Sequence, residues 1–158
     1  MSQKFLKINF IIPFKSLTGG IKVVLEYANQ LMELGHEVTV IYPLIPYYFG
    51  APKFDLKDRW WQLRGFIANL IRGNKIQWFP LKAKLKRVPR IANYFLRDAD
   101  IVVATAWPTA HSVAKLSASK GRKFYFIQSY EIWQGPKDRI DGSYRLPLKK
   151  IVIASWLK

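Results

Sequence analysis

Lys7-Ile8-Asn9-Phe10-Ile11-Ile12-Pro13, followed by Leu17-Thr18-Gly19-Gly20, is the stretch that decides the fold of this chain. The first segment predicts a short apolar strand, and the second is a glycine turn ahead of an amphipathic run over residues 21–34. Gly35 ends that run, and residues 37–42 predict a second strand. Strand, turn, helix and strand in this order predict a βαβ unit with glycines just before the helix.

The rest of the chain alternates in the same way. Further strands are predicted at residues 75–80, 100–105, 123–127 and 150–154. Further helices are predicted at residues 58–71, 88–97, 108–118 and 144–148. Apolar strands alternating with helices predict an α/β fold, a Rossmann-like open parallel sheet of about six strands with helices on both faces.

Composition fits one folded domain. Half of the 158 residues are hydrophobic, which excludes disorder, and no cysteine is available for disulfides or thiolate metal sites. The two histidines are far apart without a carboxylate cluster, so we predict no metal. No apolar run approaches the ~20 residues that cross a bilayer, and a cytoplasmic domain is expected. Because the chain stops where a last helix after Ser155 would begin, we expect one half of a larger protein.

The charge is strongly positive. Twenty-six Lys and Arg face ten Asp and Glu, a formal charge of +16, and the excess is densest between Lys53 and Arg97. Such a field attracts nucleic acid, anionic lipid or phosphorylated ligands without choosing among them. The bases form no recognisable nucleic-acid-reading helix or stacking sheet, so no specific nucleic acid is expected.

Ligands of an open parallel sheet bind beyond the carboxyl ends of its strands. Polar and aromatic side chains gather after several predicted strands, and the expected cleft holds Gly19, Gly20, Trp107, His111, Gln128, Tyr130 and Glu131, with Trp133 as a further candidate. The glycine turn is either an anion site at a helix N-terminus or a plain turn. Neither G-x-G-x-x-G nor the P-loop motif occurs, which disfavours a dehydrogenase or a P-loop nucleotidase.

Each side chain in this cleft has a structural alternative. Glu131 either orients a sugar hydroxyl or transfers a proton, or else it forms a salt bridge with one of the many bases. His111 is either catalytic or structural. Trp107 and Tyr130 either stack on a sugar ring or simply pack.

Three groups of segments carry a resemblance to a known family. They are Ile8-Asn9-Phe10-Ile11-Ile12-Pro13 with Thr18-Gly19-Gly20-Ile21, the run from Ala28 to Val38, and the later segments around Asp98–Trp107, Tyr125–Glu131 and Tyr144–Leu157. Together they resemble the N-terminal domain of family-four glycosyltransferases of the GT-B fold, in a subgroup that includes bacterial rhamnosyltransferases. The likeness covers nearly the whole chain.

The resemblance implies two facing Rossmann-like domains with the active site between them. Residues 1–158 then form the N-terminal acceptor-side domain, and the C-terminal donor-binding domain is absent from this chain. Gly19 and Gly20 are implied to touch the donor diphosphate, and Trp107, Gln128 and Tyr130 are expected at the acceptor. The implied reaction retains anomeric configuration, with a nucleotide-diphosphate sugar as donor substrate, no cofactor and no metal.

The sequence departs from the family where many relatives carry histidines. This chain has Ala106-Trp107 and Ser129-Tyr130 at those places. Glu131 and His111 therefore remain the catalytic candidates, although the resemblance to the family assigns no role to either of them.

The basic middle of the chain has two interpretations. One is a protein surface that binds the inner face of the plasma membrane, where a lipid-linked acceptor resides. This surface comprises Trp60, Trp61, Phe66, Ile67, Leu70 and Ile71 with Arg59, Arg64, Arg72 and Lys75. The other is a core helix with solvated arginines. The competing function for the whole chain is a basic nucleic-acid- or membrane-binding module without catalysis.

Overall fold

A computed structural model describes residues 5–49, 56–71, 73–131 and 135–157. Its centre is a six-stranded sheet in the order β3-β2-β1-β4-β5-β6, with every neighbouring pair parallel. The strands are β1 (Lys7–Ile11), β2 (Glu37–Pro43), β3 (Lys84–Val88), β4 (Ile101–Ala104), β5 (Arg122–Ile127) and β6 (Lys149–Val152). The predicted α/β class with an open parallel sheet of six strands is confirmed.

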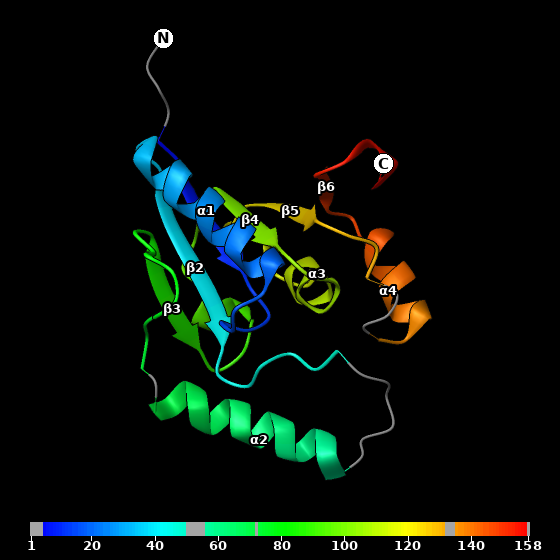
Figure 1. Ribbon diagram of the computed structural model, residues 1–158. Coiled ribbons are helices and arrows are strands. Elements are labelled where there is room, and N and C mark those ends of the chain that lie inside the picture. The colour runs from blue at the N-terminus through cyan, green and yellow to red at the C-terminus, as the bar shows by residue number, and fades with distance from the viewer. Residues whose placement is uncertain (1–4, 50–55, 72, 132–134, 158) are drawn as a thin grey trace.

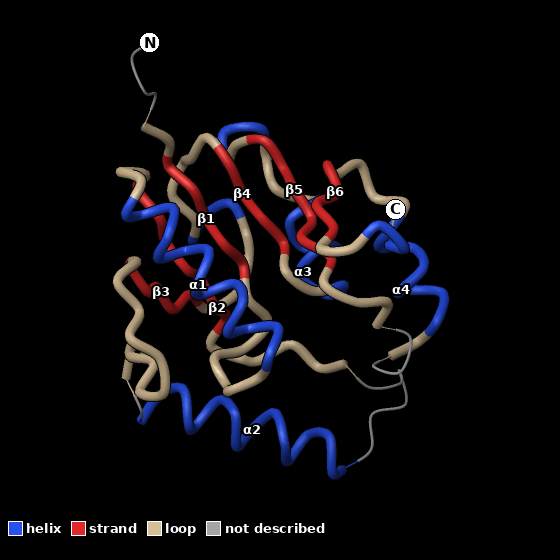
Figure 2. Tube along the Cα trace, turned by 45° about the horizontal axis from the view of Figure 1, so that its top comes forward, coloured by secondary structure: helices blue, strands red, loops and turns tan. Residues whose placement is uncertain are grey.

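Helices cover both faces of this sheet (Figures 1 and 2). The α-helices are α1 (Gly19–Glu33), α2 (Leu56–Ile71), α3 (Trp107–Ala114) and α4 (Lys137–Tyr144), and the 3₁₀ turns are η1 (Asn93–Phe95), η2 (Ala118–Lys120) and η4 (Ser155–Leu157). On one face, α1 packs on side chains such as Ile8, Phe10 and Val40. On the other face, α3 packs on side chains such as Ile11, Ile41 and Val102.

β1 shows why this sequence forms a central parallel strand. Ile8 and Phe10 point to the α1 face and Ile11 points to the α3 face, so side chains of both parities are buried. A strand covered on both sides needs a continuous apolar run instead of alternation. Asn9 is the polar exception, fully buried, and its side-chain amide donates to the carbonyl of Arg97 at 3.4 Å.

The strand predicted at residues 75–80 is wrong, because that segment is a loop and the edge strand is β3 at Lys84–Val88. The loop satisfies its polar groups elsewhere. Asn29 of α1 binds the carbonyl of Pro80 at 3.0 Å and the N–H of Lys82 at 2.7 Å, and the Trp78 indole donates to the carbonyl of Lys15 at 3.1 Å. These side-chain contacts replace the strand ladder that the apolar pattern suggested.

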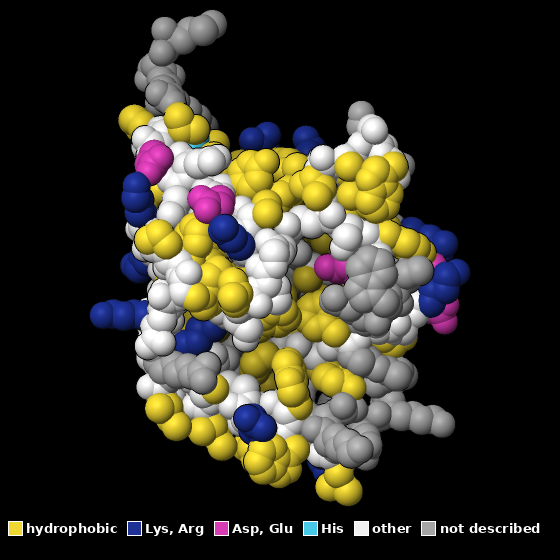
Figure 3. All heavy atoms as spheres, viewed as in Figure 1, with side chains coloured by type: hydrophobic (Ala, Val, Ile, Leu, Met, Phe, Trp, Pro, Cys, Tyr) yellow, Lys and Arg dark blue, Asp and Glu magenta, His cyan; other side chains and the backbone are white. Residues whose placement is uncertain are grey.

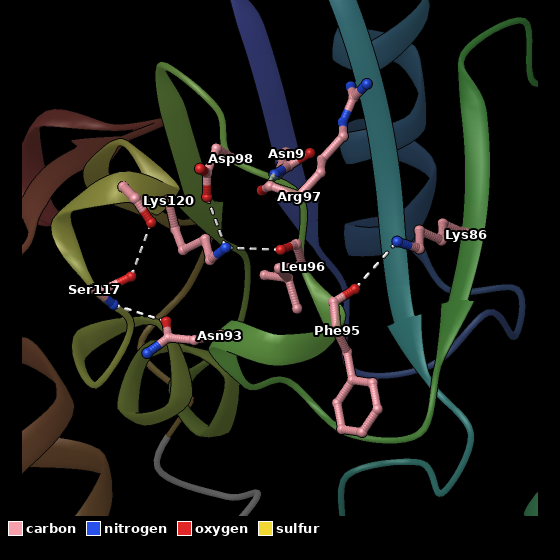
Figure 4. A network of polar contacts seen from close by, with 10 residues as sticks. Asn9, Lys86, Asn93, Phe95, Leu96, Arg97, Asp98, Ser117 and Lys120 are labelled. Carbon is pink, nitrogen blue, oxygen red and sulfur yellow. Dashed lines mark hydrogen bonds and ion pairs between the residues drawn. The ribbon is translucent and has the colours of Figure 1, made fainter.

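The helix predicted at residues 88–97 is also wrong, since only the single turn η1 forms there. Figure 4 shows how side chains hold this crossover segment between β3 and β4. Lys120 is buried, and its ammonium donates to the carbonyl of Leu96 at 2.8 Å and to the carboxylate of Asp98 at 2.7 Å. Lys86 donates to the carbonyl of Phe95 at 3.1 Å. The ammonium groups of Lys86 and Lys120 thus donate to backbone carbonyls that would be paired within the helix if one formed here.

The helix predicted at residues 144–148 lies earlier in the chain, as α4 (Lys137–Tyr144). Leu148 is buried against the α3 face just before β6, so the chain there must already be turning into the sheet. The helix α3 is shorter than predicted; it ends at Ala114, and η2 follows.

Both edges of the sheet are basic. The edge strand β3 carries Lys84, Lys86 and Arg87, and the opposite edge strand β6 carries Lys149 and Lys150. Lys84, Lys149 and Lys150 are exposed, so solvent accommodates their charge, whereas the ammonium of Lys86 is bound to the carbonyl of Phe95.

α2 lies off the sheet faces. Figure 1 shows it beyond the carboxyl ends of β2 and β3. Its contact side is small and polar: Gly65 lies against Pro46, and the buried Asn69 donates to the carbonyl of Leu44 at 2.9 Å. The predicted helix is confirmed, with its start two residues earlier at Leu56.

Candidate functional site

The strand order reverses between β1 and β4, which are neighbours in the centre of the sheet. From there the chain builds outward to β3 on one side and to β6 on the other. The hydroxyl of Thr105, just after β4, donates to the carbonyl of Ile11 at the end of β1 at 2.9 Å. In open parallel sheets this reversal opens a crevice at the carboxyl ends of the strands, where ligands bind.

Two helices begin at this reversal, and their N-termini differ. At α3, the N–H of Trp107 donates to the carboxylate of Glu131 at 3.1 Å. The hydroxyl of Thr109 accepts from the N–H groups of Thr105 and Ala106, both at 3.0 Å. The chain's own side chains therefore occupy the N-terminus of α3.

The N-terminus of α1 is open. Thr18 caps the helix by accepting from the N–H of Ile21 at 3.2 Å, while Gly19 and Gly20 occupy the first turn and are exposed. A Cβ on Gly19 would meet nothing within 4 Å. Because a helix N-terminus carries a partial positive charge, this exposed turn can accept an anion.

The glycines differ from the prediction in one respect. They form the first turn of α1, which begins at Gly19 instead of Ile21, and neither has a positive φ. Glycine is not required here for backbone conformation. Because glycine has no side chain, a ligand can approach the N–H groups of this turn closely.

Gln128 joins this turn to the end of β5. Its side-chain amide donates to the carbonyl of Gly20 at 3.1 Å, and its atoms lie 3.5–3.8 Å from the position of a Cβ on Gly20. The structure thus brings together two of the predicted site positions that are 108 residues apart in sequence.

Trp107 is placed deeper than an acceptor-stacking side chain. It is only 2% exposed, and its ring lies between the ring of Phe49 at 6.0 Å and the guanidinium of Arg139 at 5.6 Å. Gly135, with φ +155°, allows close approach because a Cβ there would be 2.8 Å from the Trp107 ring. This environment fits the packing alternative for Trp107.

His111 links two helices. Its Nε2 lies 2.9 Å from the carbonyl of Arg139 on α4, and its ring is 6.2 Å from that of Trp107. A carbonyl oxygen can only accept, so Nε2 is the donor in this contact.

Glu131 is a partly buried carboxylate whose described partner is the Trp107 N–H, not a lysine or arginine. Burial raises the pKa of Glu131 above its ordinary value, and the hydrogen bond from the Trp107 N–H opposes this in part. The salt-bridge alternative is therefore not what the described residues show. Proton transfer by Glu131 stays a prediction, and Trp133, the further candidate of this cleft, lies outside the described residues.

Tyr130 belongs to a tyrosine cluster beside Glu131. Its hydroxyl donates to the carboxylate of Asp141 at 2.8 Å, and this hydrogen bond raises the pKa of Tyr130. Its ring lies 5.7 Å from that of Tyr144, which stacks on the buried Tyr125 at 5.9 Å. The hydroxyl end of Tyr130 is thus directed to α4.

A separate pocket of about 550 Å³ lies between α2 and the loop that follows β1. It is lined by Phe14, Lys15, Ser16, Leu17, Pro46, Trp61, Arg64, Gly65, Ala68, Asn69, Lys75, Ile76, Gln77 and Trp78. None of the predicted catalytic, donor or acceptor residues lines it. The rule that ligands bind after the carboxyl ends of strands points to the loop after β1, but nothing in the sequence indicates that α2 packs beside this loop.

Comparison with family models, with curated proteins and with solved structures finds no match for this chain. Within the described ranges, no helix combines the length and hydropathy needed to cross a bilayer. Histidine and acidic side chains do not gather into a group that could hold a metal ion anywhere in the same ranges.

Proposed function

We propose that this chain is the acceptor-side domain of a retaining glycosyltransferase, and that a second domain outside it carries the nucleotide-sugar donor. The complete enzyme transfers a sugar from that donor to a glycan or a lipid-linked acceptor. The resemblance to family-four enzymes motivates this reaction, and the six-stranded parallel sheet is compatible with one half of a GT-B fold.

One observation carries the proposal most directly. Of the two helix N-termini at the sheet reversal, that of α3 is filled by Glu131 and Thr109, whereas that of α1 exposes Gly19 and Gly20. A diphosphate placed at α1 would receive backbone N–H groups and the positive end of the helix.

This placement suits the chemistry of sugar transfer. The bond between the anomeric carbon and the diphosphate oxygen breaks, and a new bond forms to the acceptor oxygen on the same face of the sugar. Negative charge grows on the departing diphosphate, whose oxygen takes up the proton that the acceptor hydroxyl loses. N–H groups preorganised at that charge lower the barrier.

Gly19→Ala tests the proposal. The new Cβ meets no protein atom within 4 Å, so the fold is kept, but it covers the N–H surface of the first turn. In a ¹⁵N-labelled sample of this chain, nucleoside diphosphates such as UDP and dTDP should shift the Gly19 and Gly20 amide signals, and Gly19→Ala should weaken binding about tenfold. In the full-length protein the same change should lower glycosyl transfer by a similar factor.

Gly142→Ala is the matched control, because it places a methyl group on α4 with only the His111 ring nearby at 3.9 Å. It should leave nucleotide binding unchanged. Amide shifts confined to residues away from α1, or a full-length protein that transfers no sugar from any nucleotide donor, would contradict the proposal.

A second candidate function is membrane contact, which is favoured by the outward side of α2. Its large apolar side chains point away from the domain: Trp60, Leu63, Ile67, Leu70 and Ile71 are 44–79% exposed. Figure 3 shows hydrophobic side chains along the rim where α2 lies, with basic side chains among them. Arg59 and Arg64 are exposed on the same helix, while Arg72 lies outside the described residues.

Vesicle sedimentation tests this candidate. An amphipathic basic helix binds anionic bilayers through apolar burial plus about 1 kcal/mol per base near the surface. The chain should sediment with vesicles containing anionic lipid, and the double variant W60S/I67S should lose most of that binding. Tyr94→Ser removes an aromatic ring that is 92% exposed away from α2 and serves as the control. Equal binding to double-stranded DNA at physiological salt would favour a nucleic-acid module instead.

A further inference from the structure

We infer that the pocket between α2 and the loop after β1 binds a sugar phosphate, which makes the acceptor of the proposed transferase a phosphate-bearing glycan. That the bound sugar phosphate is an acceptor rests on the proposed function, but the sugar-phosphate site itself follows from the pocket alone. The pocket volume of about 550 Å³ lies within the range of small-molecule sites.

Three cations from three separate segments meet in this pocket. Lys15 comes from the loop after β1, Arg64 from α2, and Lys75 from the loop that follows α2. Among the described residues that line the pocket there is no Asp or Glu. A ligand in the pocket therefore faces positive charge that no carboxylate of the lining offsets, which selects an anion.

The fold holds two of these cations by their neighbours. The ammonium of Lys15 donates to the carbonyl of Gly73 at 2.7 Å and lies 5.3 Å from the centre of the Tyr42 ring. The guanidinium of Arg64 lies 5.6 Å from the centre of the Trp60 ring. Cations that are positioned before the ligand arrives lose less entropy on binding.

Aromatic side chains in the pocket favour a ligand that carries a sugar as well as an anionic group. Trp61 is half exposed at the pocket, and Trp78 is fixed by its indole hydrogen bond to the carbonyl of Lys15. An indole ring offers a flat apolar surface that matches the C–H face of a pyranose, while the cations match a phosphate. A purely lipid ligand or a neutral sugar would bring no anionic group to these three cations.

The pocket also has a fixed wall on the side of α2. The inward residues of α2, Gly65 and Asn69, are packed against the segment after β2, so α2 forms a fixed wall. Leu17 of the lining stands two residues before Gly19, which puts the pocket next to the open turn of α1. An acceptor in the pocket and a diphosphate at α1 would therefore be neighbours.

The test is calorimetric titration of this chain with glucose 1-phosphate, glucose and inorganic phosphate. Glucose 1-phosphate should bind at least tenfold more tightly than either part alone. Lys75→Met and Arg64→Met should each lower its affinity about tenfold, since a charge-assisted hydrogen bond is lost. Trp61→Leu should weaken glucose 1-phosphate more than inorganic phosphate. Lys22→Met, an exposed cation on α1, should change nothing.

A second arm distinguishes the source of the sugar phosphate. A polyprenyl-phosphate-linked glucose in detergent micelles should bind with an equal or greater affinity and show the same loss in Lys75→Met if the acceptor is lipid-linked. Free glucose 1-phosphate binding without this second binding assigns the pocket to a soluble sugar phosphate. Thermal unfolding of each variant checks that it is folded.

Glucose binding as tightly as glucose 1-phosphate would overturn the inference, as would affinities that do not respond to Lys75→Met and Arg64→Met. Tighter, variant-sensitive binding of single-stranded DNA in the same pocket would overturn it too. Failure of the proposed function looks different, because the pocket then still binds glucose 1-phosphate while nucleoside diphosphates leave Gly19 and Gly20 unaffected.

Discussion

The side-chain amide of Gln128 donates to the backbone carbonyl of Gly20 at 3.1 Å and so fixes the end of β5 against the first turn of α1. This contact crosses the point where the sheet order reverses. It makes the position of the exposed glycine turn depend on a residue from the opposite half of the sheet.

Gln128→Ala should therefore loosen the turn more than it destabilises the domain. A neutral hydrogen bond at a partly exposed position contributes about 1 kcal/mol to the free energy of unfolding. We expect chemical denaturation to detect a loss of at most that size, while hydrogen exchange of the Gly20 and Ile21 amides becomes clearly faster. Gln77→Ala, an exposed glutamine outside this contact, should leave those amides unchanged.

Glu131→Gln should change how stability depends on pH. Burial raises the pKa of Glu131 in the folded protein above its ordinary value of 4.5, so the folded state holds this proton more tightly than the unfolded state. The stabilising effect of protonation is complete below about pH 4.5 and is lost as the pH rises through the folded pKa. The amide still offers an oxygen to the Trp107 N–H but does not titrate.

The measurable quantity is the difference in unfolding free energy, wild type minus Glu131→Gln, in half-unit steps from pH 4 to pH 7.5. It should fall as the pH rises, by about 1.4 kcal/mol for each unit by which the pKa is raised. A difference that grows with pH would mean that the charged carboxylate is favoured at the α3 N-terminus, contrary to our expectation.

Gly121→Ala should be strongly destabilising. Gly121 has φ +97°, and a Cβ there would lie 2.5 Å from the carbonyl carbon of Asp100 and 2.6 Å from the nitrogen of Ile101. Both the strained backbone and the backbone overlap at the start of β4 contribute, so we expect a loss of about 3 kcal/mol or more. Thermal unfolding beside Gly19→Ala provides the comparison, and similar melting temperatures for the two would refute the placement of η2 against β4.

Lys120→Met should weaken the crossover between β3 and β4. The variant keeps the buried aliphatic stem but removes the donor to the Leu96 carbonyl and to Asp98. We expect a loss of about 2 kcal/mol in unfolding free energy, because a buried carbonyl is left unpaired. The pKa of Asp98, which the hydrogen bond from Lys120 lowers, should rise toward its ordinary value in an NMR titration. Lys22→Met should affect neither quantity.

The interior of the sheet and its β6 edge could be predicted from the sequence, and its β3 edge could not. β1, β2, β4 and β5 are apolar runs bounded by turns, which local patterning identifies. β3 has the sequence KLKRV, and its strand character comes from pairing with β2 at the edge of the sheet. The apolar run at residues 75–80 looked more like a strand, but the N–H of Lys82 donates to the Asn29 side chain and the Trp78 indole donates to the carbonyl of Lys15.

The candidate site was predictable only as far as sheet geometry reaches. The rule for carboxyl ends placed Gly20 and Gln128 at one edge, and they are in contact. It could not foresee that Trp107 would be enclosed by Phe49 and Arg139, since both come from distant loops and helices. The pocket between α2 and the loop after β1 could not be predicted for the same reason, because it depends on how a helix beyond the sheet packs against the domain.

The lysines of β3 and β6 affect how readily this protein aggregates at high protein concentration. An open sheet ends in two strands whose outer N–H and C=O groups are ready to pair with another chain. Here any second copy approaching either border would bring its own lysines against the exposed Lys84 or against the exposed Lys149 and Lys150. Mutual repulsion thus protects both borders from sheet-to-sheet aggregation, and raising the salt concentration removes that protection.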